Sequence, residues 1–307
     1  MSDLCVCEST LPNGSQPNCA TIIGLQKKFI FVPLFDSTGA RNSIDLSATL
    51  NAAYFTAKIN HVDYSKRWYV LPEMKNVTSE IGDPTFEEFD DKTKRFVRAG
   101  VRTALGSVIN GIPSLEGAIN SFRCHRVGVF IIDINGSIIG TISEDETLLD
   151  PKEIESQSIN AKLVLASGDV SQKVDIAFQF SLNDADSSIR VLKQTDLTGV
   201  TPLTFTGLLT VKSTYSAIGL SSFKAKLFVE NGSALTKFPV KGLLAGDFAL
   251  YNVTDSLAVV IISATENPDG TYTITYAAQG ATEVLRLTPT KTGYDFAAVV
   301  ASTITLP

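Results

Sequence analysis

Cysteines near the start of the chain and a Cys-His pair further along are the side chains best suited to chemistry. Cys5, Cys7 and Cys19 offer soft thiolate ligands for a metal ion, but their spacing matches neither a zinc ribbon nor a zinc finger. Cys124 and His125 put a nucleophile beside a base, yet neighbouring residues of a strand point to opposite faces. We therefore expect reduced thiols, no metal site and no Cys-His catalysis.

Other catalytic and ligand-binding signatures are missing from the sequence. It contains no P-loop, no dinucleotide-binding glycine motif, no serine nucleophile elbow and no zinc-protease motif. His61 follows a predicted helix, where we expect a helix-end or loop role. The acidic segment 183–188 has oxygen ligands suited to Ca²⁺ but lacks the glycine and distal glutamate of an EF-hand, so we interpret it as a solvated turn. The sequence predicts a protein that is not an enzyme and has no cofactor.

A switch in the sign of charge is the most informative pattern. Acidic residues fill the segment 80–91 and basic residues the segment 92–102. The acidic residues are Glu80, Asp83, Glu87, Glu88, Asp90 and Asp91, and the basic ones are Lys92, Lys94, Arg95, Arg98 and Arg102. One interpretation is a solvated hairpin with cross-strand ion pairs, each worth under about 1 kcal/mol. The other is that acidic and basic surfaces of different copies meet in a head-to-tail assembly.

The composition indicates a folded globular protein with an acidic balance. Of its 307 residues 44% are apolar and 19% are charged, and the net charge is −6. A tight DNA binder would need a basic excess, so we do not expect one. The longest apolar run, Leu257–Ile262, is too short for a membrane helix, so we expect no membrane insertion. Residues 1–20 lack the regions of a signal peptide, which predicts synthesis and maturation in a cytoplasm.

Charge is distributed unevenly, and this predicts two domains. Residues 1–200 contain 19 of the 26 basic and 25 of the 32 acidic residues, together with both histidines, the single tryptophan and all four cysteines. Residues 201–307 are sparse in charge and rich in Thr, Ala, Leu and Val. Glycine and proline punctuate the segment Thr198–Pro202. We therefore predict one domain over 1–200 and a second over 201–307.

The first domain is predicted to be β-rich α+β. Ser43 before an apolar stripe of helical period through Ala57 predicts one helix, and Pro113–Phe122 predicts another. Asn135-Gly136 between apolar runs predicts a type I′ hairpin. The expected strands are Lys28–Leu34, Arg67–Leu71, one long strand Lys94–Ile109, Arg126–Ile134, Ser137–Ile142, Ile159–Ala166 and Lys173–Leu182.

The second domain is predicted to be an all-β, Ig-like sandwich of short strands without the Cys and Trp core of antibody domains. Asn267–Gly270 is its clearest turn, because proline presets one φ and glycine accepts a positive one. The expected strands are Leu208–Thr214, Phe223–Glu230, Leu257–Ala264, Thr271–Ala277, Thr282–Leu287 and Phe296–Ile304.

Several segments of residues 1–195 resemble structural proteins of tailed bacteriophages. They are Pro17–Cys19, Lys27–Pro33, Phe35–Gly39, Ser65–Tyr69, Phe86–Asp91, Gly100–Thr103 and Val127–Gly136. The appended module is similar to the Ig-like domains that such virion proteins carry. Among the components of a tail, the tail tube (major tail) protein matches the residues best.

The resemblance implies a self-assembling tail tube subunit: a β-rich domain with a flanking helix that forms stacked, hexameric rings around a DNA-conducting channel. Long hairpins would close the inner barrel, for which Lys94–Ile109 and Arg126–Ile142 are candidates, and Asn76–Asp91 would contact the next ring. An acidic chain suits a channel that must not hold phosphate. The candidate inter-subunit contacts are Glu87, Glu88, Asp90, Asp91, Arg95, Arg98 and Arg102.

The same resemblance implies partners and a location. The partners are further copies of the chain, other tail proteins, DNA passing through the lumen and host surface glycans that the outer Ig-like domain would contact. The location is the virion tail, assembled in the cytoplasm of the bacterial host. The alternative is a head or tail decoration, or an adhesin-like protein, that binds host surface carbohydrate.

Overall fold

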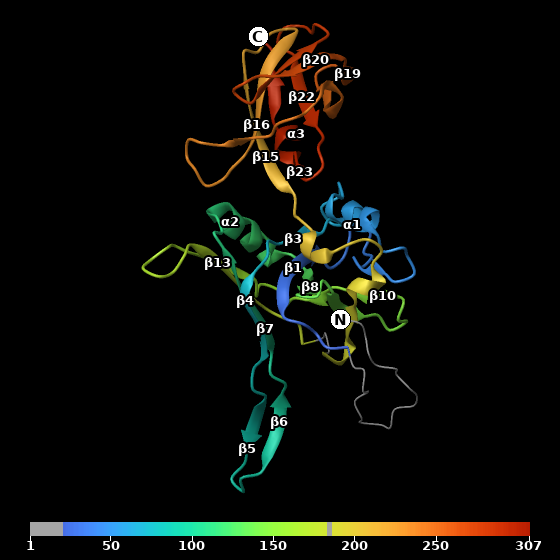
Figure 1. Cartoon of the computed structure of the whole chain (residues 1–307), viewed down its shortest axis with the longest axis vertical. Coiled ribbons are helices and arrows are strands. Elements are labelled where there is room, and N and C mark those ends of the chain that lie inside the picture. Colours follow the sequence, from blue (N-terminus) through green and yellow to red (C-terminus); the bar gives the residue numbers. More distant parts are fainter. Residues whose placement is uncertain (1–20, 183–185) are drawn as a thin grey trace.

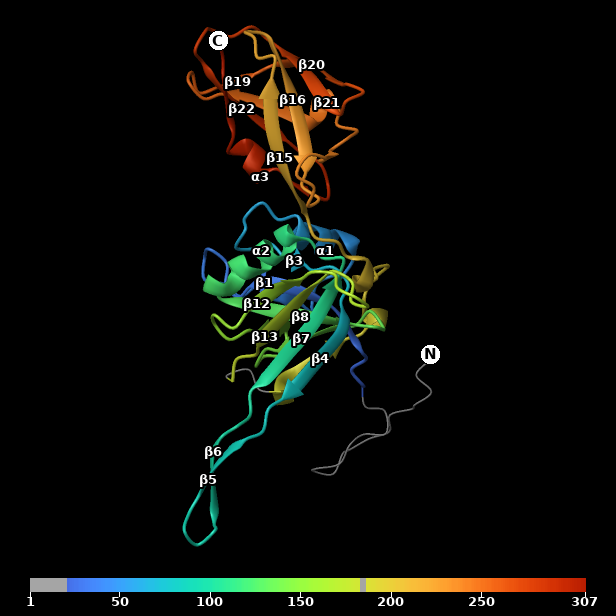
Figure 2. The same cartoon turned by 90° about the vertical axis from the view of Figure 1, so that its left-hand side faces the viewer.

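The computed structural model describes residues 21–182 and 186–307, and it confirms the predicted β-rich α+β class. The chain is elongated: a narrow hairpin extends from one end of a central body, and the C-terminal region lies at the other end (Figures 1 and 2). Cys5, Cys7 and Cys19 lie outside the described residues. Within the part that is described, no helix is long and apolar enough to cross a membrane.

An eight-stranded sheet forms the centre of the body, with β8 next to β1 at its middle. Its strands are β1 (Gln26–Pro33), β2 (Ile44–Asp45), β3 (Tyr69–Val70), β8 (Val127–Asp133), β9 (Ile138–Ile142), β10 (Leu148–Asp150), β11 (Lys152–Glu153) and β14 (Ile189–Leu192). All seven residues of β8 are buried, and so are five successive residues of β1. These near-continuous apolar runs indicate a sheet covered on both faces.

A second, four-stranded sheet has the order β12-β13-β7-β4. Its strands are β4 (Lys75–Ile81), β7 (Arg102–Ile109), β12 (Asn160–Val164) and β13 (Lys173–Gln179). Burial alternates along β13, so one face of this sheet packs inward and the other is exposed. The inward face joins one side of the eight-stranded sheet in a core around Phe29, Phe31 and Phe178.

Two helices complete the body. Helix α1 (Ala52–Ile59) packs Phe55 on the opposite side of the eight-stranded sheet, in a second core that includes Trp68 and Phe130. Helix α2 (Pro113–Ser121) packs beside β12 and contributes Ile119 to the first core. Short 3-10 turns connect the elements: η1 (Phe122–Cys124), η2 (Asp186–Ser188), η3 (Gln194–Asp196), η4 (Pro202–Thr204) and η5 (Ala245–Asp247).

The predicted strand Lys94–Ile109 is wrong, because it is two strands. β6 (Lys94–Arg98) pairs with β5 (Thr85–Glu88) in a separate ribbon, and β7 starts only at Arg102. The break lies where the backbones of the two hairpin strands come into close contact. A Cβ on Gly100 would lie 1.6 Å from the carbonyl oxygen of Gly82. Only glycine permits this approach, so the ribbon leaves the sheet at this point.

The C-terminal region has two sheets that enclose a core of its own, built from residues 211–306, whereas the other two cores lie within residues 29–200. One sheet contains β15 (Leu209–Ser216), β16 (Ser222–Val229), β17 (Phe238–Pro239), β20 (Ile261–Glu266), β21 (Thr271–Tyr276) and β23 (Tyr294–Asp295). The other contains β18 (Phe248–Asn252), β19 (Leu257–Val259), β22 (Val284–Pro289) and β24 (Thr303–Thr305). The boundary at residue 200 stays a prediction.

Polar contacts hold the connecting chain and the C-terminal region against the body. The ammonium of buried Lys28 donates to the carbonyl oxygens of Leu203 and Phe205, both at 2.7 Å, and burial lowers the pKa of this lysine. The guanidinium of Arg67 lies 2.8 Å from the carboxylate of Asp295 on β23. Arg67 is 7% exposed, so this ion pair is shielded from solvent and ties the two regions together.

The start of the first helix differs from the prediction. The helix begins at Ala52, and Asn51 rather than Ser43 is its cap, with its side-chain oxygen accepting from the Tyr54 N–H at 3.0 Å. The Ser43 hydroxyl instead donates to the carboxylate of Asp150, which holds the segment extended as β2.

The turn at Asn135-Gly136 also differs. Of this pair only Gly136 has a positive φ (78°), which rules out type I′, where both central residues need one. The Gly136 N–H donates to the Asp133 carbonyl oxygen at 3.0 Å and neither residue between them has a positive φ, which makes the turn type I followed by a glycine bulge. The Asp133 carboxylate supports it by accepting from the N–H groups of Asn135 and Ser137. The turn at Asn267–Gly270 has the expected positive φ at Gly270 (76°).

Two expected C-terminal strands are divided. Leu257–Ala264 crosses between the sheets at Val260 and forms both β19 and β20. Phe296–Ile304 contains the short helix α3 (Ala297–Val300) before β24, because the Asp295 carboxylate accepts from the Ala297 N–H at 3.1 Å and starts a turn. Strand β18 was not predicted, although its burial alternates with a two-residue period.

The close approach of Gly100 to Gly82 predicts different effects for two alanine substitutions. Gly100→Ala forces the two backbones apart, so we expect faster limited proteolysis within residues 83–99 but little change in the melting temperature, because the ribbon contributes to no core. Gly117→Ala, on exposed helix α2 with open space around it, should stabilise the protein by about 0.5–1 kcal/mol. Equal proteolysis of both variants would contradict the assigned role of Gly100.

Candidate assembly surface

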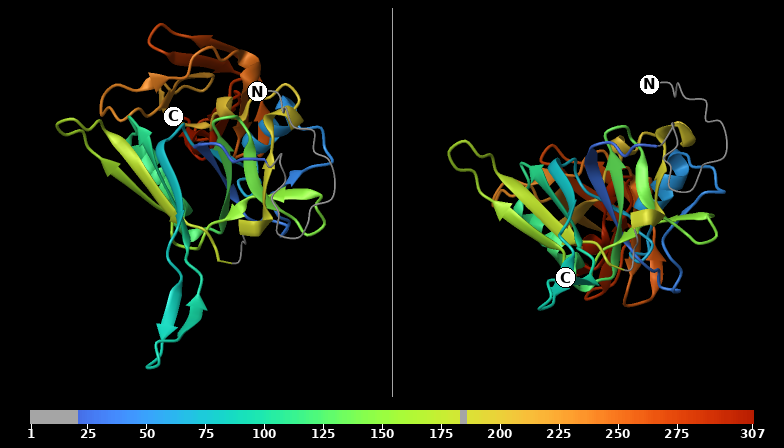
Figure 3. Two further views of the ribbon diagram at one scale, coloured as in Figure 1. Left: turned by 60° about the horizontal axis from the view of Figure 1, so that its bottom comes forward. Right: turned by 90° about the horizontal axis from the view of Figure 1, so that it is seen from below.

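The charge switch found in the sequence lies on one projecting ribbon, formed by residues 82–101 with β5 and β6 as its strands. With the bottom of the molecule turned forward, the ribbon extends away from both sheets (Figure 3, left). Glu87 faces Arg95 and Glu88 faces Lys94 across it. The Glu88 and Lys94 side chains form an exposed ion pair at 3.5 Å. This pair fits the interpretation as a solvated hairpin.

Other candidate charges of the ribbon are free for a partner. Among the described residues, Arg95 has no ion pair, and neither has Arg98, whose Nε donates only to the Thr85 hydroxyl at 3.2 Å. Glu87 and Asp90 likewise have none. Exposed charges without partners contribute little to the stability of a single chain, but they set the orientation and specificity of an interface.

Arg102 has a different position from the other candidates. It lies at the start of β7, and its guanidinium binds both carboxylate oxygens of Asp186, the closest at 2.9 Å. It also donates to the carbonyl oxygen of Ser79 on β4. Lys152, which is 2% exposed, approaches the same carboxylate at 3.3 Å. Arg102 is thus engaged within its own chain, at the base of the ribbon.

The tip of the ribbon is preformed. Phe89 and Thr93 pair through their backbones at 3.0 Å, and Lys92 takes a positive φ of 65°. The Asp91 carboxylate accepts from both the hydroxyl and the N–H of Thr93, and these hydrogen bonds lower the pKa of Asp91. The tip therefore keeps Asp90 and Asp91 together in a defined, acidic turn.

Exposed apolar side chains are the feature of the ribbon that sequence reasoning missed. Phe86 and Phe96 face each other with their ring centres 5.9 Å apart, and they are 50% and 57% exposed. Phe89 at the tip and Val97 are 45% and 56% exposed. The signal was present in the sequence, because Phe86 and Phe89 interrupt the acidic segment and Phe96 interrupts the basic one. Because a lone two-stranded ribbon is only marginally stable in water, such residues indicate a surface that a partner covers.

The exposed face of the four-stranded sheet is the second candidate surface. Leu105 and Ile109 on β7 are 50% and 41% exposed, and Leu105 lines a shallow pocket of about 290 Å³ together with Gln179. The charged residues of this face are Lys75, Glu80, Lys162, Lys173 and Asp175. This face therefore carries both basic and acidic groups, and the net negative charge of the chain is not concentrated on it. The predicted barrel hairpin Arg126–Ile142 lies elsewhere, because β8 is buried on both faces.

The residues first considered for catalysis are not assembled into a site. His61 follows α1, and its Nδ1 accepts from the Asp63 N–H at 3.1 Å, as a loop residue would. Cys124 ends the turn η1 and is exposed, as is His125. Among residues 21–182 and 186–307, no three His, Cys, Asp or Glu side chains are placed to hold a metal ion. The described part of segment 183–188 uses Asp186 to bind Arg102.

Comparisons of the chain with protein-family models, with curated proteins and with solved structures gave no match.

The Arg102–Asp186 pair predicts a pH-dependent anchor. Burial raises the pKa of Asp186, but the hydrogen bonds and charge of Arg102 and the charge of Lys152 outweigh it, so the folded-state pKa is lowered. A lowered folded pKa means that the pair stabilises the protein above the ordinary aspartate pKa, about 4, and that this contribution is lost as the pH falls through the folded value.

Asp186→Asn should therefore melt below the wild type at pH 7, and the difference should shrink as the pH falls below about 4. Melting curves between pH 7 and pH 2.5 measure this effect. Asp169→Asn, at an exposed loop position, is the control and should follow the wild type throughout. A difference that stays constant across the whole pH range would contradict the assigned ion pair.

Proposed function

We propose that the protein is a structural subunit of a bacteriophage tail, one that polymerises into a tail tube of stacked rings. One observation carries the proposal: a preformed ribbon, rich in exposed aromatic and unpaired charged side chains, extends from one end of the body and contributes to no core of its own chain. Such an element has a physical purpose only when another molecule covers it.

A second copy of the chain is the simplest partner. The ribbon and the C-terminal region lie at opposite ends (Figure 1), so a contact between unlike ends repeats along one direction. Contacts between unlike surfaces produce rings when the rotation closes and filaments when it does not. A tube of stacked rings uses both: one contact closes each ring and the ribbon joins successive rings.

The four-stranded sheet supplies a means of closing a ring. Within the described residues, its outer strands β12 and β4 each have one neighbour in the sheet. On β12 the Asn120 side chain of α2 binds the N–H and the carbonyl oxygen of Ala161, so a strand that pairs there has to displace it. Pairing of the β4 edge of one copy with the β12 edge of the next would join the sheets into a continuous barrel and leave no edge exposed. Leu105 and Ile109 would then line its inner wall. Six copies and the passage of DNA follow from the resemblance to tail tube proteins.

The C-terminal region fits an Ig-like module displayed on the outside of such a tube. It has two sheets and a separate core, and its sequence lacks catalytic groups. Contacts with host surface glycans and with other tail proteins, and assembly in the host cytoplasm into the virion tail, belong to the same proposal.

Negative-stain electron microscopy of the purified chain over a range of concentrations tests the proposal. We expect rings or hollow tubes with a central channel, increasing with protein concentration. If the chain stays monomeric at every concentration and salt condition, also after addition of preformed tail ends, the proposed function is wrong.

Charge reversal tests the role of the ribbon in the same assay. Replacing Arg95 and Arg98 together by Glu leaves the cores untouched but reverses the unpaired basic charges, so we expect tubes to be replaced by single rings or monomers. The control is Lys224→Glu, a reversal at an exposed position of β16. Circular dichroism should show that both variants are folded. Normal tubes from the double variant would exclude a role for these two arginines in stacking.

A further inference from the structure

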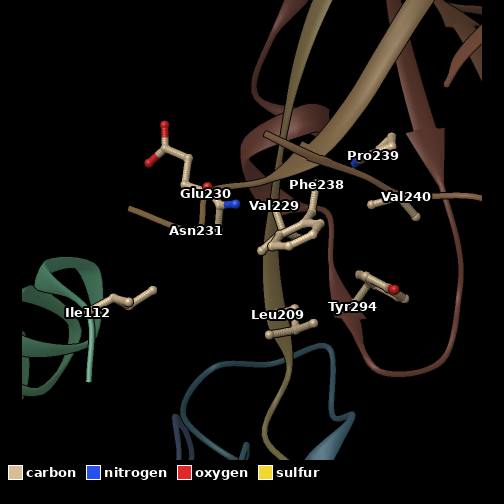
Figure 4. Close-up of a pocket in the computed structure, with 9 residues that line it drawn as sticks. All are labelled: Ile112, Leu209, Val229, Glu230, Asn231, Phe238, Pro239, Val240 and Tyr294. Atoms are coloured by element: carbon tan, nitrogen blue, oxygen red, sulfur yellow. The ribbon is translucent and has the colours of Figure 1, made fainter. Parts of the chain in front are cut away.

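An apolar groove lies between the C-terminal region and the body. It has a volume of about 460 Å³ and is lined chiefly by Leu209, Val229, Phe238, Val240 and Tyr294 from the C-terminal side and by Ile112 from the body. Figure 4 shows Ile112, at the start of α2, pointing across the groove toward the cluster around Phe238 and Leu209. Phe238 is 62% exposed and Leu209 50%, so the groove is open to a partner.

The groove is held open by the contacts that join the two regions. Tyr294, in its wall, is the neighbour of Asp295, whose carboxylate forms the shielded ion pair with Arg67 of the body. Lys28 holds the connecting chain at Leu203 and Phe205. Because these contacts fix the position of β23 relative to the body, the two regions do not close on the apolar surface between them.

The rim of the groove is basic. Glu230 is the acidic residue of its lining, and Lys212 and Lys237 neutralise it at 2.9 and 3.8 Å. At the other end, the ammonium of Lys291 lies 5.8 Å from the ring centre of Tyr294 and donates to the carbonyl oxygen of Lys241. Glu266 also lies at this end, where its carboxylate accepts from the Gly242 N–H at 2.8 Å. The ammonium groups of Lys212, Lys237 and Lys291 against the carboxylates of Glu230 and Glu266 leave the rim with a small positive balance.

The tip of the ribbon has the complementary properties. Phe89 is exposed at the turn, and acidic residues surround it: Glu87, Glu88, Asp90 and Asp91 against Lys92 and Lys94. From Gly82 to Asp90 the ribbon extends for roughly 25 Å at the rise of a β-strand. It therefore reaches well beyond the body, on the side opposite to the C-terminal region (Figure 2).

We propose that this groove is the receptor for the ribbon tip of the next copy along the tube, with Phe89 inserted among Ile112, Leu209 and Phe238 and the acidic turn against the lysines of the rim. The inference rests on the proposed function, because a head-to-tail stack is what brings the ribbon end of one copy to the groove end of another. An aromatic anchor buried in an apolar pocket with a charged rim is the usual composition of an interface hot spot. The C-terminal region thereby takes part in stacking and is more than an outer decoration.

Photo-crosslinking tests the contact directly in assembled protein. The photoreactive residue p-benzoylphenylalanine replaces Phe89, and the full-length chain is mixed with isotope-labelled wild type before irradiation. We expect mass spectrometry to find cross-links between different chains, from position 89 to peptides that contain residues 209–212 or 229–240. The same residue at Val170, an exposed position of the loop between β12 and β13, is the control and should not label these peptides.

Paired substitutions test the energetic role of the groove. Phe238→Asp places a charge in the groove, whereas Leu235→Asp changes a 94% exposed residue of the loop before β17 that does not line the groove. We expect the first variant to raise the protein concentration needed for tubes by about tenfold or more and the second to leave it unchanged. Both positions are exposed, so both variants should have the same melting temperature as the wild type.

The outcomes separate the two proposals. Tubes that cross-link from position 89 to other peptides, or that form equally well with Phe238→Asp, would overturn the groove as the receptor and leave the tube proposal intact. Wild-type protein that forms neither rings nor tubes would overturn the tube proposal, and the groove assignment with it.

Discussion

Strand β1 is the constraint on which the rest of the body depends. Its successive side chains point in opposite directions, so Phe29 and Phe31 enter one core while Ile30 and Val32 enter the other. A strand used on both faces must be apolar throughout and must be covered on both sides. The four-stranded sheet covers one side and helix α1 the other, and the outer faces of these two layers are exposed surfaces of the body. The positions of the ribbon base and of the groove follow from this arrangement, because β7 and α2 both belong to the layers packed around β1.

Much of this arrangement could be predicted from residue patterns. The apolar runs of β1 and β8 and the helix beginning at Pro113 depend on local sequence, and they lie where they were expected. The break before β7 could not be predicted, because it depends on Gly100 meeting Gly82, a contact between residues that only the folded hairpin brings together. Ser43 failed as a helix cap for the same reason: its partner, Asp150, lies far along the chain and competes successfully for the hydroxyl.

The candidate surface was predictable only in part. The charge switch identified the ribbon, because it depends on composition within one short segment. Arg102 was predicted to contact a partner together with the neighbouring charges, because no local signal in the sequence shows that it forms an ion pair with Asp186. The exposed aromatic residues were visible in the sequence, but an aromatic residue in a strand is usually a core residue, so its exposure required a structure. The groove brings Ile112 close to residues more than ninety positions away in the sequence, so it could not be predicted from the spacing of residues.

The close approach of Gly82 and Gly100 has a consequence for variation within such a protein. The direction of the ribbon is determined by two backbones at its base, and its residues 83–99 are exposed. Substitutions at the tip therefore leave the cores untouched, and in the proposed assembly they would have to be matched by substitutions at the rim of the groove. In that proposed assembly, two variants of the chain with different tip and rim pairs would form polymers that exclude each other's subunits, and the same exchange in the laboratory would yield filaments with an order of subunits set by design.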